Sequence, residues 1–236
     1  MMEGAVKAVI YAIGDLHLSL QSNKPMDVFG GVWAGYLEKI RKNFSKLTDE
    51  DVCVLCGDLT WGMDLEECLE DFRFINDLPG KKILLKGNHD FWWTTATKAK
   101  RFFDRHGLDK LDILHNNCHF VGDTAICGTR GWFYEEEVSP EHDRKIMARE
   151  VTRLETSLKA AAGAKEILVF LHYPPIFYNF LCRDIIDLMK RYGVRHCYYG
   201  HIHGEGHKLA TRGERDGIVY HMVSADFVDF NPVPVK

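Results

Sequence analysis

The motif Gly87-Asn88-His89-Asp90 comes one residue after the end of the apolar run Ile83-Leu84-Leu85. A short apolar run that stops at turn residues is typical of a buried strand. The arrangement recurs where residues 9–13, 52–56, 167–171 and 197–199 lead into Gly14-Asp15-Leu16-His17, Gly57-Asp58-Leu59, His172-Tyr173-Pro174-Pro175 and Gly200-His201-Ile202-His203-Gly204. Sites form at the carboxyl ends of strands in α/β sheets. The pattern therefore predicts that these Asp, Asn and His side chains meet at one edge of a sheet.

The first half of the chain alternates apolar runs with amphipathic stretches. It predicts strands over residues 6–13, 51–56 and 82–86, and helices over residues 32–44, from Asp64 to Pro79-Gly80, and from Thr94 or Thr95 to His106. Residues 19–31 contain Ser, Asn, Pro and Gly and are expected to form a loop beside the first motif. This order of elements favours a largely parallel layer.

The second half of the chain has shorter apolar runs. Residues 113–114, 118–121 and 124–128 predict a meander of antiparallel strands. Ser139-Pro140 predicts the start of a long helix that ends near Ala162-Gly163. A further helix is expected over residues 177–192, followed near the end by short strands over residues 208–223 with a turn at Arg212-Gly213. Together the elements predict one domain, residues 1–236, with two sheets.

Composition and charge exclude several classes of protein. A chain of 236 residues with 46% hydrophobic content can bury a full core. The net charge of −4 argues against binding to nucleic acid through bulk electrostatics. No run approaches the roughly 20 apolar residues that span a bilayer, and Met1-Met2-Glu3 leads almost directly into a strand without a signal-peptide pattern. We therefore expect a cytoplasmic protein with neither membrane nor nucleic acid as its partner.

The cysteines do not form a disulfide framework, because there are seven of them in a long chain. Cys53-Val54-Leu55-Cys56 has the spacing of some zinc and redox sites. It lies inside an apolar run, however, where an extended backbone points positions i and i+3 to opposite faces. We expect both cysteines to be buried core thiols.

The residue types in the strand-end motifs point to metal binding. Asp15 and His17, like His201 and His203, are i, i+2 pairs, so each pair projects to one side of an extended backbone. Asp and His together suit Zn, Fe, Mn or Co. The candidate ligands are too many for one tetrahedral ion: Asp15, His17, Asp58, Asn88, His172, His201 and His203. Two divalent cations against two carboxylates leave a net positive charge, which predicts a two-metal site that hydrolyses an anionic ester.

The motif series from Asp15 to His203 resembles the calcineurin-like metallophosphoesterase superfamily, with all five motifs in the order of that superfamily. The resemblance implies an α/β fold, a four-layer αββα sandwich of two mixed β-sheets flanked by helices. It also implies two divalent transition-metal ions, such as Mn, Fe or Zn.

The resemblance implies a role for each motif residue. One metal would be held by Asp15, His17 and His203, and a second by Asn88, His172 and His201, with Asp58 bridging the two. A hydroxide between the metals would attack phosphorus, and His89 would act as general acid toward the leaving group. Asp90 would hydrogen-bond the His89 ring and hold its tautomer.

Differences between these motifs and those of known subfamilies narrow the range of expected substrates. Protein serine/threonine phosphatases carry an Asp-Arg-Gly motif, whereas Asp58 is followed here by Leu59 and Thr60. The lipid A pathway pyrophosphatases have a similar first motif but usually carry Arg where this chain has His89. Cyclic-nucleotide phosphodiesterases use a Gly-Asn-His-Asp motif like this one. The sequence thus favours a small phosphodiester or nucleotide-like substrate.

Three alternatives remain open. The first is a phosphomonoesterase, and the second is a catalytically silent scaffold of the same fold. The third is a nuclease, which the acidic net charge and the lack of basic tracts disfavour. The physiological substrate and the oligomeric state are not predicted.

Other residues near the motifs have a structural and a functional interpretation. The aromatic triplet Phe91-Trp92-Trp93 is expected to pack on the helix that follows it rather than to stack a nucleobase. Lys98, Lys100 and Arg101 are expected to form a solvated helix face. Arg130 and His207 are secondary candidates, the first for a phosphate oxygen and the second for contact with the site.

Overall fold

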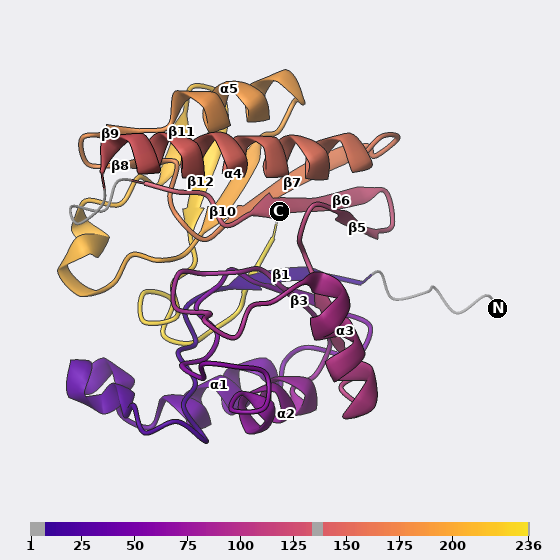
Figure 1. Cartoon of the computed structure of the whole chain (residues 1–236), viewed down its shortest axis with the longest axis vertical. Coiled ribbons are helices and arrows are strands. Elements are labelled where there is room, and N and C mark those ends of the chain that lie inside the picture. The colour runs from indigo at the N-terminus through magenta and orange to yellow at the C-terminus, as the bar shows by residue number, and fades with distance from the viewer. Residues whose placement is uncertain (1–7, 134–138, 236) are drawn as a thin grey trace.

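The computed structural model describes residues 8–133 and 139–235 and has four layers (Figure 1). Two β-sheets stack on one another in the middle of the molecule. Helices α1, α2 and α3 cover the outer face of one sheet, and α4 and α5 cover the outer face of the other. The predicted αββα sandwich of two mixed sheets is therefore confirmed.

The first sheet is built from the N-terminal half and one C-terminal strand, in the order β13-β1-β2-β3-β4. Its strands are β1 (Ile10–Ile13), β2 (Val52–Leu55), β3 (Lys81–Leu84), β4 (Leu111–Ile113) and β13 (Val233–Pro234). Strands β1 to β4 are parallel, and β13 runs antiparallel to β1 at the edge. The crossovers carry α1 (Tyr36–Phe44), α2 (Leu69–Asp77) and α3 (Ala96–Arg105).

The second sheet has the order β11-β12-β10-β7-β6-β5. Its strands are β5 (Cys118–Val121), β6 (Thr124–Thr129), β7 (Glu166–Leu171), β10 (His196–Tyr199), β11 (Gly213–Arg215) and β12 (Ile218–Met222). The four inner strands are parallel, and the two edge strands are antiparallel to their neighbours. Its helices are α4 (Pro140–Ala160) and α5 (Arg183–Arg191).

Burial on both faces explains why the inner strands have continuous apolar sequences. Each sheet packs helices on its outer face, and a third apolar cluster that includes Val54 and Phe170 lies between the sheets. A strand covered on both faces needs apolar side chains at every position. Cys53 packs toward the helices and Cys56 between the sheets, both fully buried. The prediction that they are core thiols on opposite faces is confirmed.

The predicted antiparallel meander was partly wrong. Of its three runs, only β5 and β6 pair as an antiparallel hairpin, because Gly122 allows the positive φ of a tight turn. Strand β4 instead joins β3 in parallel, since α3 carries the chain back to the starting end of the first sheet. Strand β6 likewise pairs with β7 in parallel.

Three predicted boundaries were also wrong. The helix expected over residues 177–192 begins only at Arg183, because a hairpin of β8 (Ile176–Phe177) and β9 (Phe180–Leu181) comes first, turning at Tyr178 with φ 48°. Helix α1 begins at Tyr36, since Gly35 has a left-handed φ of 64°. The turn expected at Arg212-Gly213 lies at Asp216-Gly217, where both residues have positive φ, as in hairpins with an Asp-Gly turn.

Two segments connect strands of the first sheet to the helices after them. Before α1 the chain forms two short 3-10 helices. The first, η1 (Met26–Phe29), lies within the loop predicted over residues 19–31, and the second, η2 (Gly31–Trp33), begins at its last residue. Asp64 caps a turn by accepting from the backbone of Glu66 and Glu67, and α2 starts after it. Among the described residues, no helix is both long and apolar enough to cross a membrane.

Candidate metal centre

The strand-end motifs of both sheets meet at one edge of the sandwich. Asp15 and His17 follow β1, Asp58 follows β2 and Asn88 follows β3 in the first sheet, while His172 follows β7 and His201 and His203 follow β10 in the second. The carboxyl ends of parallel strands share one edge of a sheet. Stacking the two sheets then brings the two sets of side chains together.

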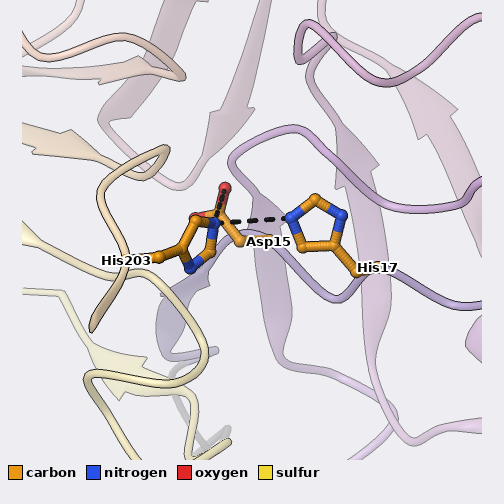
Figure 2. A group of neighbouring side chains, drawn as sticks. All are labelled: Asp15, His17 and His203. Atoms are coloured by element: carbon orange, nitrogen blue, oxygen red, sulfur yellow. Dashed lines mark hydrogen bonds and ion pairs between the residues drawn. The ribbon is translucent and has the colours of Figure 1, made fainter. Parts of the chain in front are cut away.

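The first group consists of Asp15, His17 and His203 (Figure 2). Their ligand atoms all lie within 4.8 Å of one another. Nε2 of His203 lies 3.4 Å from Nε2 of His17 and 3.6 Å from Oδ1 of Asp15. The Asp15 carboxylate also accepts from the backbone N–H of His201, at 2.9 and 3.0 Å, which ties the first sheet to the second.

The second group consists of Asp58, His172 and His201, again with ligand atoms within 4.8 Å. Oδ1 of Asn88 joins it, at 2.7 Å from Nε2 of His172 and 3.0 Å from Nδ1 of His201. Oδ2 of Asp58 lies between the two groups, 3.5 Å from Nε2 of His172 and 3.8 Å from Nε2 of His17. The structure thus brings together all seven residues that the sequence nominates as ligands.

Hydrogen bonds select the ring nitrogens that face the centre. Nδ1 of His172 lies 2.9 Å from the carbonyl oxygen of Cys56. A carbonyl only accepts, so Nδ1 carries the proton and Nε2 presents its lone pair toward Asp58. Nδ1 of His203 similarly lies 2.9 Å from Oδ1 of Asp226, which directs Nε2 toward Asp15. Metal-binding histidines are held in this way by acceptors behind the ring.

The backbone that carries these side chains is strained. Asp15, His17, Asp58 and His201 have φ values of 59°, 45°, 53° and 72°. Residues with a Cβ rarely adopt such values, and each costs on the order of 1–3 kcal/mol. Strain of this kind persists where the surrounding structure holds it, and it concentrates at functional sites. Each of these residues belongs to one of the two ligand groups.

Two motif glycines are required by close approach. A Cβ at Gly87 would overlap the carboxylate and backbone nitrogen of Asp58. A Cβ at Gly200 would overlap the carboxylate of Asp15. The glycines in these motifs therefore leave space for the acidic side chains of neighbouring strands.

Burial keeps three of the candidate histidines in the neutral form that binds metal. Burial lowers the pKa of His172 to about 3 and holds the pKa of His17 and His201 well below the usual value. Burial, together with the nearby Asp90 and Asp15, raises the pKa of Asp58. Burial opposes charge on His203 too, but hydrogen bonds to Asp15 and Asp226 raise its pKa to about 10. The neutral imidazoles of His17, His172 and His201, together with the carboxyl groups of Asp15 and Asp58, are ligand types that Zn, Fe or Mn accepts, and a bound ion would displace the proton that His203 otherwise holds.

Asp90 lies behind the centre and is fully buried. Its carboxylate accepts hydrogen bonds from the backbone N–H groups of Gly87, Asp58 and Leu59, at 2.7 to 2.9 Å, and from the Trp92 indole at 3.0 Å. The sequence assigned Asp90 to the His89 ring. These contacts give it a further task, because they fix the backbone of the second and third motifs relative to each other, while its contact with the His89 ring stays a prediction.

Sequence reasoning missed Asp226. Besides His203, its carboxylate contacts the backbone N–H of Gly204 at 3.1 Å and Nε2 of His207 at 3.3 Å. The signal that found the other residues was present, because Asp226 follows the end of the apolar strand β12. His207 therefore touches the carboxylate behind His203.

The aromatic residues divide into core and site. Trp92 is buried and packs edge-on against Phe72, so it belongs to the core, but this contact is with α2, the helix before the triplet, rather than with the helix that follows. Trp61 and Trp33, which the sequence did not assign to the site, contact the His17 ring. Trp61 stacks on it at 4.9 Å between centroids, and Trp33 meets it edge-on at 5.9 Å.

The backbone carbonyl of Arg130 accepts from the N–H of His172 at 3.1 Å, but the side chains of the basic candidates face other partners or solvent. Arg130 packs over the Trp132 ring at 4.8 Å and lies 4.0 Å from Glu150. Lys98, Lys100 and Arg101 are exposed on α3, so the predicted solvated face is confirmed.

Comparison with known proteins places this arrangement in a family. The chain is similar to a solved protein of unknown function, AQ665 from Aquifex aeolicus, with 19% identity, a TM-score of 0.51 and coverage of 96% of this chain and 95% of that one. It is also similar to phosphopantetheinyl hydrolase (PptH) from Mycobacterium tuberculosis, with 14% identity, a TM-score of 0.56 and coverage of 97% and 96%. At these identities the likeness shows a shared fold. No curated protein sequence matches significantly. The family model of the calcineurin-like phosphoesterases matches residues 8–205, which contain all five motifs, and the chain therefore belongs to the calcineurin-like phosphoesterase family.

Proposed function

We propose that the chain is a phosphoester hydrolase that uses two divalent metal ions. The observation that supports this best is the position of the Asp58 carboxylate between the two ligand groups. Its Oδ2 lies 3.5 Å from Nε2 of His172 in its own group and 3.8 Å from Nε2 of His17 in the other. The family is generally one of metal-dependent phosphoesterases, which agrees with this donor set. Two divalent cations held there would supply Lewis acidity toward phosphoryl oxygens and toward water.

The ligand assignment follows the two groups. The first ion would be held by Asp15, His17 and His203, and the second by Asn88, His172 and His201. Asp58 would contact both ions, because one of its oxygens faces both groups. Asp90 and Asp226 are positioning residues in this proposal, the first for Asp58 and the second for His203.

His89 is the proposed general acid. Its backbone N–H donates to Oδ1 of Asp58 at 2.8 Å, so its place beside the centre is fixed by a candidate ligand. Its ring lies 5.8 Å from that of His17 and 4.5 Å from that of Trp61. An imidazolium here would give its proton to the oxygen of the leaving alcohol.

The proposed substrate is a small, nucleotide-like phosphodiester, with a phosphomonoester as the alternative. Asp58 is followed by Leu59 and Thr60, so the arginine of the serine/threonine phosphatase motif is missing at this position. The similar solved structure named as a phosphopantetheinyl hydrolase supports hydrolytic use of the fold.

The test removes metal with a chelator, restores Mn²⁺, and follows hydrolysis of bis(p-nitrophenyl) phosphate and p-nitrophenyl phosphate. Metal content is measured by mass spectrometry for the native chain, for His172→Ala and for His142→Ala, which is a matched control on the exposed face of α4. We expect metal-dependent hydrolysis with the diester preferred, loss of metal and activity in His172→Ala, and neither loss in His142→Ala. A protein that holds two metal ions and hydrolyses neither ester would contradict the proposal.

A further inference from the structure

A cavity of about 320 Å³ opens beside the first ligand group. Its polar side is formed by His17, His89 and His203. Its other side is apolar and is lined by Met26, Phe29, Trp33 and Trp61. The cavity is therefore continuous with the candidate metal centre but is built from a different kind of residue.

The apolar side is supplied mainly by η1 and η2, the short helices before α1. Phe29 is 66% exposed although it lines the cavity, and its neighbour Val28 is 71% exposed. A cluster of exposed apolar side chains at the rim of a cavity is typical of a ligand-binding site. The segment is tied to the centre, because Trp61 Nε1 lies 3.2 Å from Sδ of Met26 and the Trp61 ring stacks on His17.

The position of His89 shows which end of a phosphoester would enter the cavity. The His89 ring lies 4.5 Å from Trp61, and both residues line the cavity. A phosphoryl group beside Asp58 would direct its leaving oxygen toward His89, since that ring is the proposed proton donor. The carbon atoms attached to that oxygen would then continue between Trp61 and Phe29.

We infer that this cavity binds an apolar alkyl or aryl group carried by the leaving alcohol of the substrate. The inference rests on the proposed function. It adds that the enzyme prefers substrates whose leaving alcohol is apolar. In the reaction, the water oxygen bonds to phosphorus and releases a proton to solvent, the bond from phosphorus to the alcohol oxygen breaks, and protonated His89 gives its proton to that oxygen and regains one from solvent. Met26, Phe29, Trp33 and Trp61 take no part in these bond changes and act by removing the apolar group from water.

A matched pair of substrates tests the inference. Phenyl and 4-butylphenyl esters, taken as diester or monoester according to which the protein hydrolyses, have leaving groups of similar acidity and differ in apolar size. We expect kcat/KM to favour the butylphenyl ester by about tenfold, as partial burial of four carbons predicts. Phe29→Ala should reduce this preference to about twofold and Phe29→Leu should restore most of it. Val28→Ala, an equally exposed neighbour that does not line the cavity, should leave the preference as it is.

A binding experiment separates this inference from the proposed function. Binding of methylphosphonate, hexylphosphonate and phenylphosphonate to the Mn²⁺-loaded protein is measured by calorimetry, because their P–C bonds are not hydrolysed. Tighter binding of either larger probe that weakens in Phe29→Ala supports the inference, and the comparison of hexyl with phenyl distinguishes an alkyl from an aryl occupant. Equal binding of all three probes, or an equal loss in Phe29→Ala and Val28→Ala, overturns it. Apolar preference in binding without hydrolysis of any ester would overturn the proposed function, and with it the assignment to a leaving alcohol, while the cavity would remain an apolar binding site.

Discussion

The Asp226 carboxylate accepts from Nδ1 of His203 at 2.9 Å, so the opposite ring nitrogen faces Asp15. Hydrogen bonds behind a metal-binding histidine fix its orientation and typically contribute about 10- to 100-fold in metal affinity. Asp226→Asn should therefore weaken Mn²⁺ binding by about that factor. Calorimetric titration of the metal-free protein measures it. Asp229→Asn, whose side chain is 80% exposed, is the control. Identical titrations of the two variants would refute a positioning role for Asp226.

Substitutions of His89 and His172 should reduce activity for different reasons. His89→Ala should lower kcat by about 10²- to 10⁴-fold, the usual contribution of a general acid, while leaving both metal ions bound. His172→Ala removes a nitrogen that faces Asn88 and Asp58, so metal content itself should fall. Parallel measurements of metal content and single-turnover rate distinguish the two. If His89→Ala also lost metal, His89 would be a ligand and not the proton donor.

Gly87→Ala should unfold more easily than the native protein. The added methyl group meets the backbone nitrogen of Asp58, which cannot move away as a flexible side chain would. Overpacking of this kind costs about 1–3 kcal/mol of unfolding free energy. Gly31→Ala is the matched control, since nothing lies within 4 Å of a Cβ there. Urea unfolding of the metal-free proteins gives both values, and equal stability of the two variants would contradict the expected overlap.

Native cysteines should react slowly with iodoacetamide, and Cys118 should react first. Burial raises the pKa of Cys127 to about 12 and of Cys182 to about 11, so little of the reactive thiolate forms at pH 8. Cys118 is only partly buried, although burial raises its pKa as well. Because the thiolate fraction grows as pH approaches a raised pKa, labelling should accelerate between pH 8 and pH 10. Peptide mass spectrometry locates the label, and urea-unfolded protein is the control in which all seven thiols react. Rapid labelling of Cys127 in the native protein would show that the core between the second sheet and helices α4 and α5 opens.

The ligand groups were predictable because each ligand follows a parallel strand, and a strand end is a local signal. Asp226 has the same signal after β12 but lies outside the motif series that the resemblance covers. The hairpin before α5 was missed because Ile176, Phe177 and Phe180 are also spaced like one face of a helix, and the turn at Tyr178 has no glycine to mark it. Trp33 and Trp61 could not be assigned to the site, because their place beside His17 depends on contacts between distant segments.

Both ligand groups contain residues from each sheet, and both need His201 or His203, which follow β10. During synthesis strands β1 to β4 of the first sheet emerge from the ribosome well before these histidines, and only the edge strand β13 follows them. A nascent chain with β1 to β4 complete offers Asp15, His17, Asp58 and Asn88 but lacks every imidazole of the second sheet. Metal binding would therefore come late in folding, after synthesis of the second sheet. A bound ion would indicate a molecule in which the two sheets have already packed against each other.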